Sequence, residues 1–184
     1  LELIESGAQK LTDAKVSFGH GTTNAFDEAA WLVLWSLGLP LDTPLDGPDS
    51  KGNMPLALVD STQAATLLEA RVQTRKPAAY LTHEAWLQGV AFYVDERVIV
   101  PRSLIAELIV EGGIDYWLQE STHTVLDLCT GNGSLAVIAA LTYPDTVVTG
   151  SDLSADALAV ARINVDKHGL QDRITLLESD GLRS

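Results

Sequence analysis

The spacing of apolar residues predicts helices in the first part of the chain. Residues 24–38 show helical periodicity between a polar Asn start and a Gly stop. A second helical pattern runs from about residue 61 to 75 and ends before a proline. Between them, residues 40–55 are rich in Pro, Gly, Asp and Asn, which is typical of a surface loop. We therefore expect a helical domain over residues 1–80.

The pattern changes to that of a β-hairpin after residue 80. Two runs rich in aromatic and β-branched residues flank Gln88-Gly89, which predicts a tight turn between two strands. The second strand is expected to continue in extended form as far as Pro101. Residues 81–102 are therefore expected to form a β-hairpin linker.

From residue 103 to residue 184 the pattern predicts an α/β domain. A helix is expected after Ser103, its N-cap, and from Thr124 onward apolar strands alternate with amphipathic helices. The expected strands cover residues 124–129, 146–152 and 173–179, and the expected helices cover residues 134–143 and 154–169. This order predicts a parallel sheet whose first strand is buried. Three strands make only about half of a doubly wound domain, so we expect an incomplete domain and a truncated chain.

Composition and charge narrow the classes of function. The chain has 184 residues, 46% of them hydrophobic, which is enough for a globular core. Twelve Lys and Arg against 25 Asp and Glu give a net charge of −13, which disfavours a nucleic-acid partner. The chain shows neither an apolar run of membrane-spanning length nor a signal segment, so a cytoplasmic protein without membrane contact is expected. One cysteine and four scattered histidines predict no disulfide and no metal site.

The candidate site begins at Gly131-Asn132-Gly133, where the first strand turns into a helix. At such a turn a ligand can approach the bare backbone, although glycines can also serve turn geometry alone. Asp152 ends the next strand about 20 residues further on, where a carboxylate binds ribose hydroxyls. Alternatively, Asp152 only stabilises the start of the following helix. The spacing fits both a nicotinamide dinucleotide and S-adenosylmethionine.

Asp127 distinguishes these two cofactors by its charge. It lies on the first strand four residues before Gly131 and is expected to face the loop. A carboxylate would repel a pyrophosphate but attract the sulfonium and ammonium of S-adenosylmethionine, so the methyl donor is favoured. Alternatively, Asp127 only accepts hydrogen bonds from the amides of the loop, which would be compatible with either cofactor.

Two further parts of the site give weaker indications. Asp180 and Gly181 follow the third strand, as expected for groups near an adenine, although a solvated turn explains them equally well. Cys129 has no neighbouring histidine to generate a thiolate, so a packing role is expected rather than catalysis.

The sequence resembles a specific family at this loop and on both sides of it. The resemblance rests on "VLDLCTGNGSLAVIAA", with "VDERVIVPRSLIAELI" before it and "SDLSADALAVARINVDKHGLQDRI" after it. It extends to "FGHGTTNAFDEAAWLVLWSLGLPLD" and "PAAYLTHEAWLQGVAFYVDERV" near the N-terminus. These segments resemble the class I methyltransferases that methylate glutamine side chains in proteins. They are most similar to the branch acting on large-subunit ribosomal protein L3.

The resemblance implies a helical substrate-recognition domain, a hairpin linker and a Rossmann-like domain that binds S-adenosylmethionine. It implies that Asp152 binds the ribose, that Asp180-Gly181 lies by the adenine and that Arg102 lies at the mouth of the site. A surface ion pair of Arg102 with Glu107 or Asp95 is the alternative. The full expected set for the cofactor is Asp127, Cys129, Thr130, Gly131, Asn132, Gly133, Asp152, Leu153, Asp180 and Gly181.

Two departures from the family pattern limit what can be assigned. Leu104 stands where the branch commonly has proline. The Asn-Pro-Pro-Tyr motif that binds the target amide in this family does not occur in the sequence and is expected beyond Ser184. No catalytic residue is therefore assigned, and the fragment is expected to be inactive. Three alternatives remain: methylation of peptide release factors, an NAD-binding oxidoreductase, and a module that only binds a protein partner.

Overall fold

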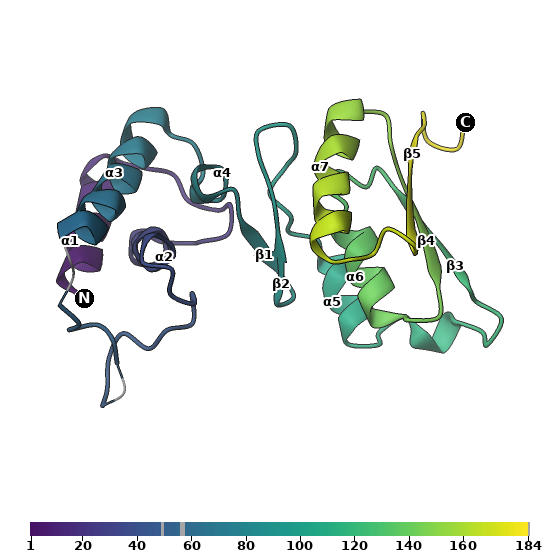
Figure 1. The fold of residues 1–184 in the computed structure, drawn as a ribbon, viewed down its shortest axis with the longest axis horizontal. Helices are drawn as coiled ribbons and strands as arrows, with labels where there is room; N and C mark the ends of the chain where they lie inside the picture. The colour runs from purple at the N-terminus through teal and green to yellow at the C-terminus, as the bar shows by residue number, and fades with distance from the viewer. Residues whose placement is uncertain (49, 56–57, 184) are drawn as a thin grey trace. The chain divides into compact units, whose positions relative to one another are not determined.

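The structure is a computed structural model that describes residues 1–48, 50–55 and 58–183, without the side chains of residues 58 and 59. The chain forms two compact units, Leu1–Thr82 and His83–Ser184 (Figure 1). The hairpin groups with the second unit. The expected division into a helical domain, a linker and a methyltransferase domain stays a prediction.

The first unit is helical. Its elements are α1 (Glu2–Asp13), α2 (Ala25–Ser36), α3 (Leu58–Thr74) and α4 (Ala78–Thr82). As the sequence predicts, α2 begins after Asn24, whose side chain accepts the N–H of Asp27 at 2.9 Å. This bond satisfies one of the N–H groups that a helix start leaves unpaired. Apolar residues of α1, α2 and α3, such as Leu11, Leu32 and Leu68, are buried and form the core of the unit.

A buried ion pair holds part of this unit together. Arg71 Nε lies 2.5 Å from Glu28 Oε1, and both side chains are almost completely buried. Thr22 donates its hydroxyl to the other oxygen of Glu28 at 2.7 Å, and Arg71 also donates to the carbonyl of Ser17 at 2.8 Å. The pair therefore ties α3 to α2 and to the segment that precedes α2.

The hairpin forms as predicted, but its second strand is shorter than expected. Strands β1 (Ala85–Leu87) and β2 (Val90–Phe92) pair antiparallel around a turn in which Gln88 and Gly89 both have positive φ. The prediction of an extended strand to Pro101 is wrong, because β2 ends at Phe92. A turn follows, in which the N–H of Val98 bonds to the carbonyl of Asp95 at 3.1 Å.

The rest of the second unit confirms the α/β fold class. Strands β3 (Thr124–Leu128), β4 (Val147–Asp152) and β5 (Ile174–Glu178) form a parallel sheet in the order β3-β4-β5. The helices are α5 (Leu104–Val110), the short 3-10 helix η1 (Asp115–Trp117), α6 (Ser134–Thr142) and α7 (Ala155–Lys167). Ser103 and Ser154 cap α5 and α7 through their side chains, as the sequence predicts.

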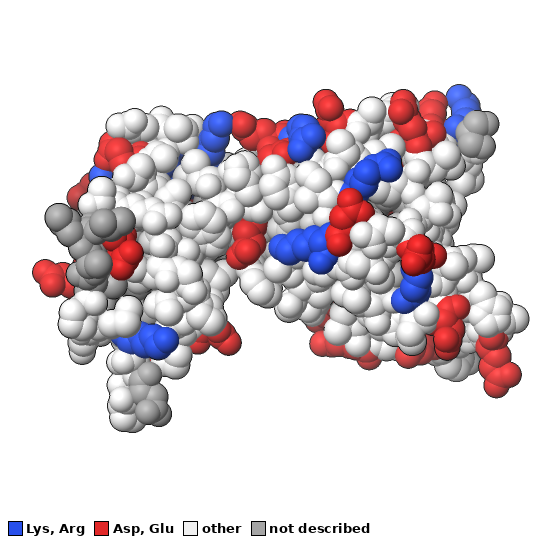
Figure 2. All heavy atoms as spheres, viewed as in Figure 1, with Lys and Arg blue, Asp and Glu red and all other residues white. Residues whose placement is uncertain are grey.

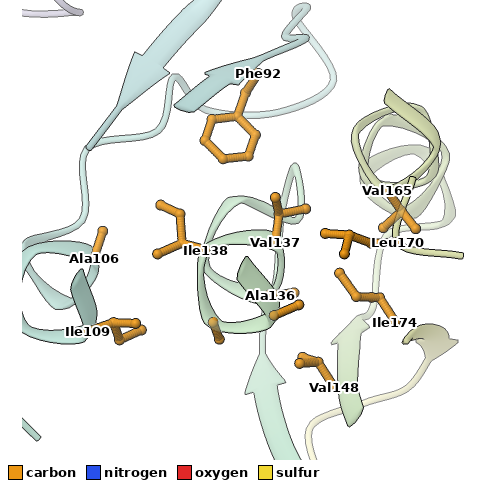
Figure 3. Packing of buried hydrophobic residues seen from close by; sticks show 12 residues of the cluster. Phe92, Ala106, Ile109, Ala136, Val137, Ile138, Val148, Val165, Leu170 and Ile174 are labelled. Carbon is orange, nitrogen blue, oxygen red and sulfur yellow. The ribbon is translucent and has the colours of Figure 1, made fainter. Parts of the chain in front are cut away.

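The core of the second unit lies on one side of the sheet, where Figure 1 shows α5, α6 and α7. Figure 3 shows Val137 and Ile138 of α6 between Phe92 of the hairpin and Val148 of β4. On the opposite face of β3, Leu126 and Leu128 are 52% and 43% exposed. The expectation of a buried first strand is therefore wrong, because no helix in the described part of the chain covers that face.

Two surface features follow from the composition. Acidic side chains are spread widely over the face drawn in Figure 2, where basic ones are fewer. No helix in residues 1–48, 50–55 and 58–183 is both long enough and apolar enough to span a bilayer.

Candidate functional site

The loop between β3 and α6 has an unusual backbone. Cys129, Gly131 and Gly133 all have left-handed φ values, at 58°, 57° and 78°. The N–H of Thr130 donates to the carbonyl of Ser151 in β4 at 2.8 Å, and the N–H of Gly133 donates to the carbonyl of Thr130 at 2.9 Å. The loop is thus folded tightly and attached to the neighbouring strand.

The two glycines of this loop have different roles. A Cβ on Gly133 would lie 3.1 Å from Cβ and 3.3 Å from Cα of Ala161, so Gly133 is needed where α6 approaches α7 closely. A Cβ on Gly131 would meet no heavy atom of the described residues within 4 Å. Turn geometry and helix packing therefore account for Gly133, whereas Gly131 leaves open space above its backbone.

A cavity of about 270 Å³ lies at this loop. It is at the carboxyl end of β3, the edge of a parallel sheet at which ligands commonly bind. Its walls are Ile99, Pro101, Arg102, Ser103, Asp127, Leu128, Cys129, Thr130, Gly131, Asn132, Ser134 and Leu135. Five residues of the predicted cofactor set, Asp127 and residues 129–132, therefore share one cavity with Arg102.

Asp127 is a half-buried carboxylate in this cavity. Burial raises its pKa above the ordinary value, and the charge of Asp152 raises it further. Two hydrogen bonds lower the pKa of Asp127 instead. One comes from the hydroxyl of Thr130, which donates to Asp127 Oδ2 at 2.6 Å, and the other from the N–H of Ala136. Asp127 thus accepts a hydrogen bond from a side chain of the loop, the Thr130 hydroxyl. The charged form still carries a net cost, which a cation in the cavity would offset.

Asp152 holds the loop from the end of β4. Its Oδ2 accepts the N–H of Gly131 at 2.9 Å, and its Oδ1 accepts the N–H of Ser154 at 2.9 Å. The carboxylate is therefore engaged at the start of α7, as the alternative interpretation expects. It does not contribute to the cavity wall. Each oxygen keeps acceptor capacity, so ribose binding by Asp152 stays a prediction.

The remaining predicted residues lie outside the cavity. Leu153 is 67% exposed, and Asp180 is exposed beside Arg183, 3.8 Å away. The N–H of Ser179 donates to the carbonyl of Asp152 at 3.0 Å, which brings the ends of β4 and β5 together. Binding of the ribose or adenine by Leu153, Asp180 and Gly181 stays a prediction.

Arg102 contributes to the cavity wall from the segment that precedes α5. One of its alternative partners, Asp95, is bound by Arg97, whose guanidinium lies 2.6 Å from it. Mainly through this side-chain bond, the pKa of Asp95 falls to about 2.

Sequence reasoning missed Asn164 in α7, which is fully buried. Its side-chain Nδ2 donates to the backbone carbonyls of Asn132 at 2.8 Å and Tyr93 at 3.0 Å. Its Oδ1 accepts the N–H of Tyr93 at 2.7 Å. The sequence could have indicated this residue, because Asn164 lies on the same helix face as the apolar residues Val160 and Ala161.

Asn132 has a polar atom without a partner. Its Oδ1 accepts the N–H of Ser134 at 3.2 Å, but its buried Nδ2 has no hydrogen-bond partner in the part of the chain that the structure describes. Because Asn132 contributes to the cavity wall, a ligand with an acceptor group would satisfy this donor. Within the described ranges, no three His, Cys, Asp or Glu side chains gather as a metal site requires.

Comparison with known proteins shows which proteins the chain resembles. Residues 114–184 match the family model of the methyltransferase small domain. The ribosomal protein uL3 glutamine methyltransferase of Burkholderia pseudomallei is 49% identical to this chain over 181 residues, which cover 97% of the chain and 57% of that protein. The chain is therefore similar to this relative over almost its whole length.

Relatives with the same name in Neisseria meningitidis serogroup A and Bordetella pertussis are 45% and 47% identical, each over 97% of this chain. The chain spans 57–59% of the length of these three relatives. One solved structure with partial similarity to the chain is that of a human methyltransferase 10 domain containing protein. The match covers 50% of this chain and 46% of that protein's chain, at 16% sequence identity and a TM-score of 0.40. That likeness is too limited to support a functional conclusion.

Proposed function

We propose that this protein transfers a methyl group from S-adenosylmethionine to the side-chain amide nitrogen of a glutamine in ribosomal protein uL3. The observation that carries the proposal is the 49% identity to the ribosomal protein uL3 glutamine methyltransferase of Burkholderia pseudomallei. This identity extends over 97% of the chain and so includes both compact units. The cavity beside the β3–α6 loop supports it independently, because the carboxylate of Asp127 lies in its wall and would attract the cationic groups of the cofactor.

Three groups of the cavity would hold this cofactor. The carboxylate of Asp127 would offset the positive charge of the sulfonium and ammonium groups. The open backbone at Gly131 would allow close approach, and Nδ2 of Asn132 would donate to an acceptor of the ligand. Asp152 would bind the ribose hydroxyls, and Asp180 with Gly181 would lie by the adenine.

The task of these residues is to position the methyl donor. S-adenosylmethionine supplies an electrophilic methyl group, so that a C–N bond forms at the amide while the C–S bond breaks and the amide loses a proton. An amide nitrogen is a poor nucleophile, since its lone pair is delocalised, and alignment with the donor is therefore essential. We propose that the helical first unit recognises the protein substrate. The chain contains no Asn-Pro-Pro-Tyr to hold the amide, so no catalytic residue is assigned.

Calorimetric titration tests the cofactor. We expect the 184-residue chain to bind S-adenosylmethionine and S-adenosylhomocysteine in preference to NAD, because Asp127 would repel a pyrophosphate. Binding of NAD alone would support the oxidoreductase alternative.

The acceptor is tested by mass spectrometry with the product of the full reading frame. Ribosomal protein uL3 and a peptide release factor are offered together with S-adenosylmethionine. We expect a mass increase of one methyl group on a uL3 glutamine, whereas methylation of the release factor alone would overturn this choice of acceptor.

A further inference from the structure

We propose that Asn164 is a positioning residue that couples the segment after the β-hairpin to the cofactor loop. This inference rests on the proposed function in one respect, that the loop binds an S-adenosyl nucleotide. It assigns Asn164 a role in cofactor affinity although the residue lies outside the cavity wall.

The hydrogen bonds of Asn164 join two segments that are distant in sequence. One bond reaches the carbonyl of Asn132 in the loop, and two reach the backbone of Tyr93, directly after β2. The side chain has no exposed surface, so water cannot replace these bonds. The positions of the two backbones are therefore fixed relative to each other through one amide group.

The hairpin is also fixed to α7 at a second place. His168 follows the last turn of α7, and its Nε2 donates to the carbonyl of Ala91 at 2.9 Å, since a carbonyl oxygen can only accept. The ring of Phe92 packs against the His168 ring with centroids 5.6 Å apart. Residues 91–93 are thus attached to α7 over consecutive positions.

Both segments joined by Asn164 lead to the same cavity. The loop provides Cys129 to Asn132, and the chain that leaves Tyr93 provides Ile99, Pro101 and Arg102 a few residues later. Two walls of the cavity are therefore positioned from one residue of α7. Ordering of the loop by a ligand should reduce the motion of the Tyr93 backbone, because the amide of Asn164 links them.

Only an amide side chain fits this position. The site presents two carbonyl oxygens and one N–H, and an amide supplies two donors and an acceptor on a short side chain. Aspartate has nearly the same shape but would place an oxygen against both carbonyls. Alanine would leave all three backbone groups without these partners.

The experiment compares Asn164→Ala and Asn164→Asp with Val165→Ala, a matched control at a buried core position next to Asn164. Calorimetry measures the Kd for S-adenosylhomocysteine, and thermal unfolding measures Tm. We expect each Asn164 variant to raise Kd by about tenfold or more, since net loss of one or two hydrogen bonds has this magnitude. Val165→Ala should lower Tm while leaving Kd within about twofold, as it removes only packing.

Hydrogen exchange provides the readout that a purely structural role would not change. In the wild type and in Val165→Ala, S-adenosylhomocysteine should increase the protection of the Tyr93 amide as well as that of the loop. In Asn164→Ala the ligand should protect the loop without protecting Tyr93. Wild-type affinity in both Asn164 variants, or an equal loss in Val165→Ala at the same decrease in Tm, would overturn the proposal.

Failure of the proposed function gives a different result. If the wild type binds NAD but not S-adenosylhomocysteine, the methyltransferase proposal fails, and the same comparison of Kd and exchange is made with NAD. Without any ligand, Asn164→Ala should already increase exchange at Ser134 and Tyr93 together. Unchanged exchange at both amides would overturn the coupling whatever the ligand is.

Discussion

The carboxylate of Asp152 accepts the backbone N–H of Gly131 at 2.9 Å, so the end of β4 holds the loop that follows β3. The second oxygen of the same carboxylate accepts the N–H of Ser154 at the start of α7. Asp152, which is expected to bind the ligand, thus also stabilises the loop. Both roles depend on its carboxylate.

Replacing Asp152 with Asn should therefore reduce both stability and affinity. An amide can offer its oxygen to only one of the two N–H groups and would turn its own NH₂ toward the other. We expect a loss of about 1–3 kcal/mol in the free energy of unfolding, measured by urea denaturation, together with weaker binding of S-adenosylhomocysteine. The control is Asp156→Asn, an exposed acid in the first turn of α7, which should change both quantities much less. Equal unfolding free energies of Asp152→Asn and Asp156→Asn would contradict a stabilising role of the Asp152 carboxylate.

Asp127 should titrate above the ordinary range of aspartate, because burial raises its pKa. Carboxyl NMR of the folded chain should show this shift, and Thr130→Val should raise the pKa further by removing a hydrogen bond to the charged form. S-adenosylmethionine, which is cationic at sulfur, should lower the pKa. A pKa at or below the ordinary value in the free protein would contradict this account.

The same residue should make stability depend on pH. Because the folded pKa lies above the unfolded one, the contribution of Asp127 is present at low pH and is lost as the pH rises through the folded pKa. Asp127→Asn, which cannot ionise, should therefore gain stability relative to the wild type as the pH rises over that interval. It should also lose more affinity for S-adenosylmethionine than for the uncharged sulfur of S-adenosylhomocysteine. A stability difference that is independent of pH would be evidence against this prediction.

Gly133→Ala should be more destabilising than a glycine replacement that adds only backbone strain. The added Cβ would press against Cβ and Cα of Ala161, and the new alanine would also have to adopt a left-handed φ. Gly169 also has a left-handed φ, but a Cβ there would meet nothing within 4 Å in the part of the chain that the structure describes. We expect roughly 1–2 kcal/mol for Gly169→Ala from strain, and about 1–3 kcal/mol more for Gly133→Ala from overpacking. Similar unfolding free energies for the two variants would contradict this prediction, because they would mean that α7 shifts to accommodate the added methyl group.

Glu28→Gln should destabilise the first unit strongly, because it leaves Arg71 buried without a counter-charge. Breaking a buried pair in this way costs about 3–5 kcal/mol. The matched control is Glu69→Gln, which breaks the exposed ion pair with Lys10 and should change stability little. The measurement is urea unfolding followed by helical circular dichroism. A small effect in both variants would indicate that the surroundings of Arg71 relax to admit water.

Local sequence determined where most elements begin and end. The caps at Asn24, Ser103 and Ser154 form as predicted, since a cap is a hydrogen bond between residues two or three positions apart. The alternation of strands and helices, and the turn at Gln88-Gly89, are local in the same sense. The loop after β3 was also found from spacing, because a strand-to-helix turn with glycines has a short-range pattern.

The tertiary structure decided the features that depend on distant partners. The length of β2 depends on the turn at Asp95, and the exposure of β3 depends on which helices cover the sheet. The pairing of Glu28 with Arg71 and the bonds of Asn164 to Asn132 and Tyr93 join residues far apart in the chain. Periodicity shows that a side chain is on the buried face of its helix. It does not show which backbone groups meet that side chain there, because packing alone brings them together.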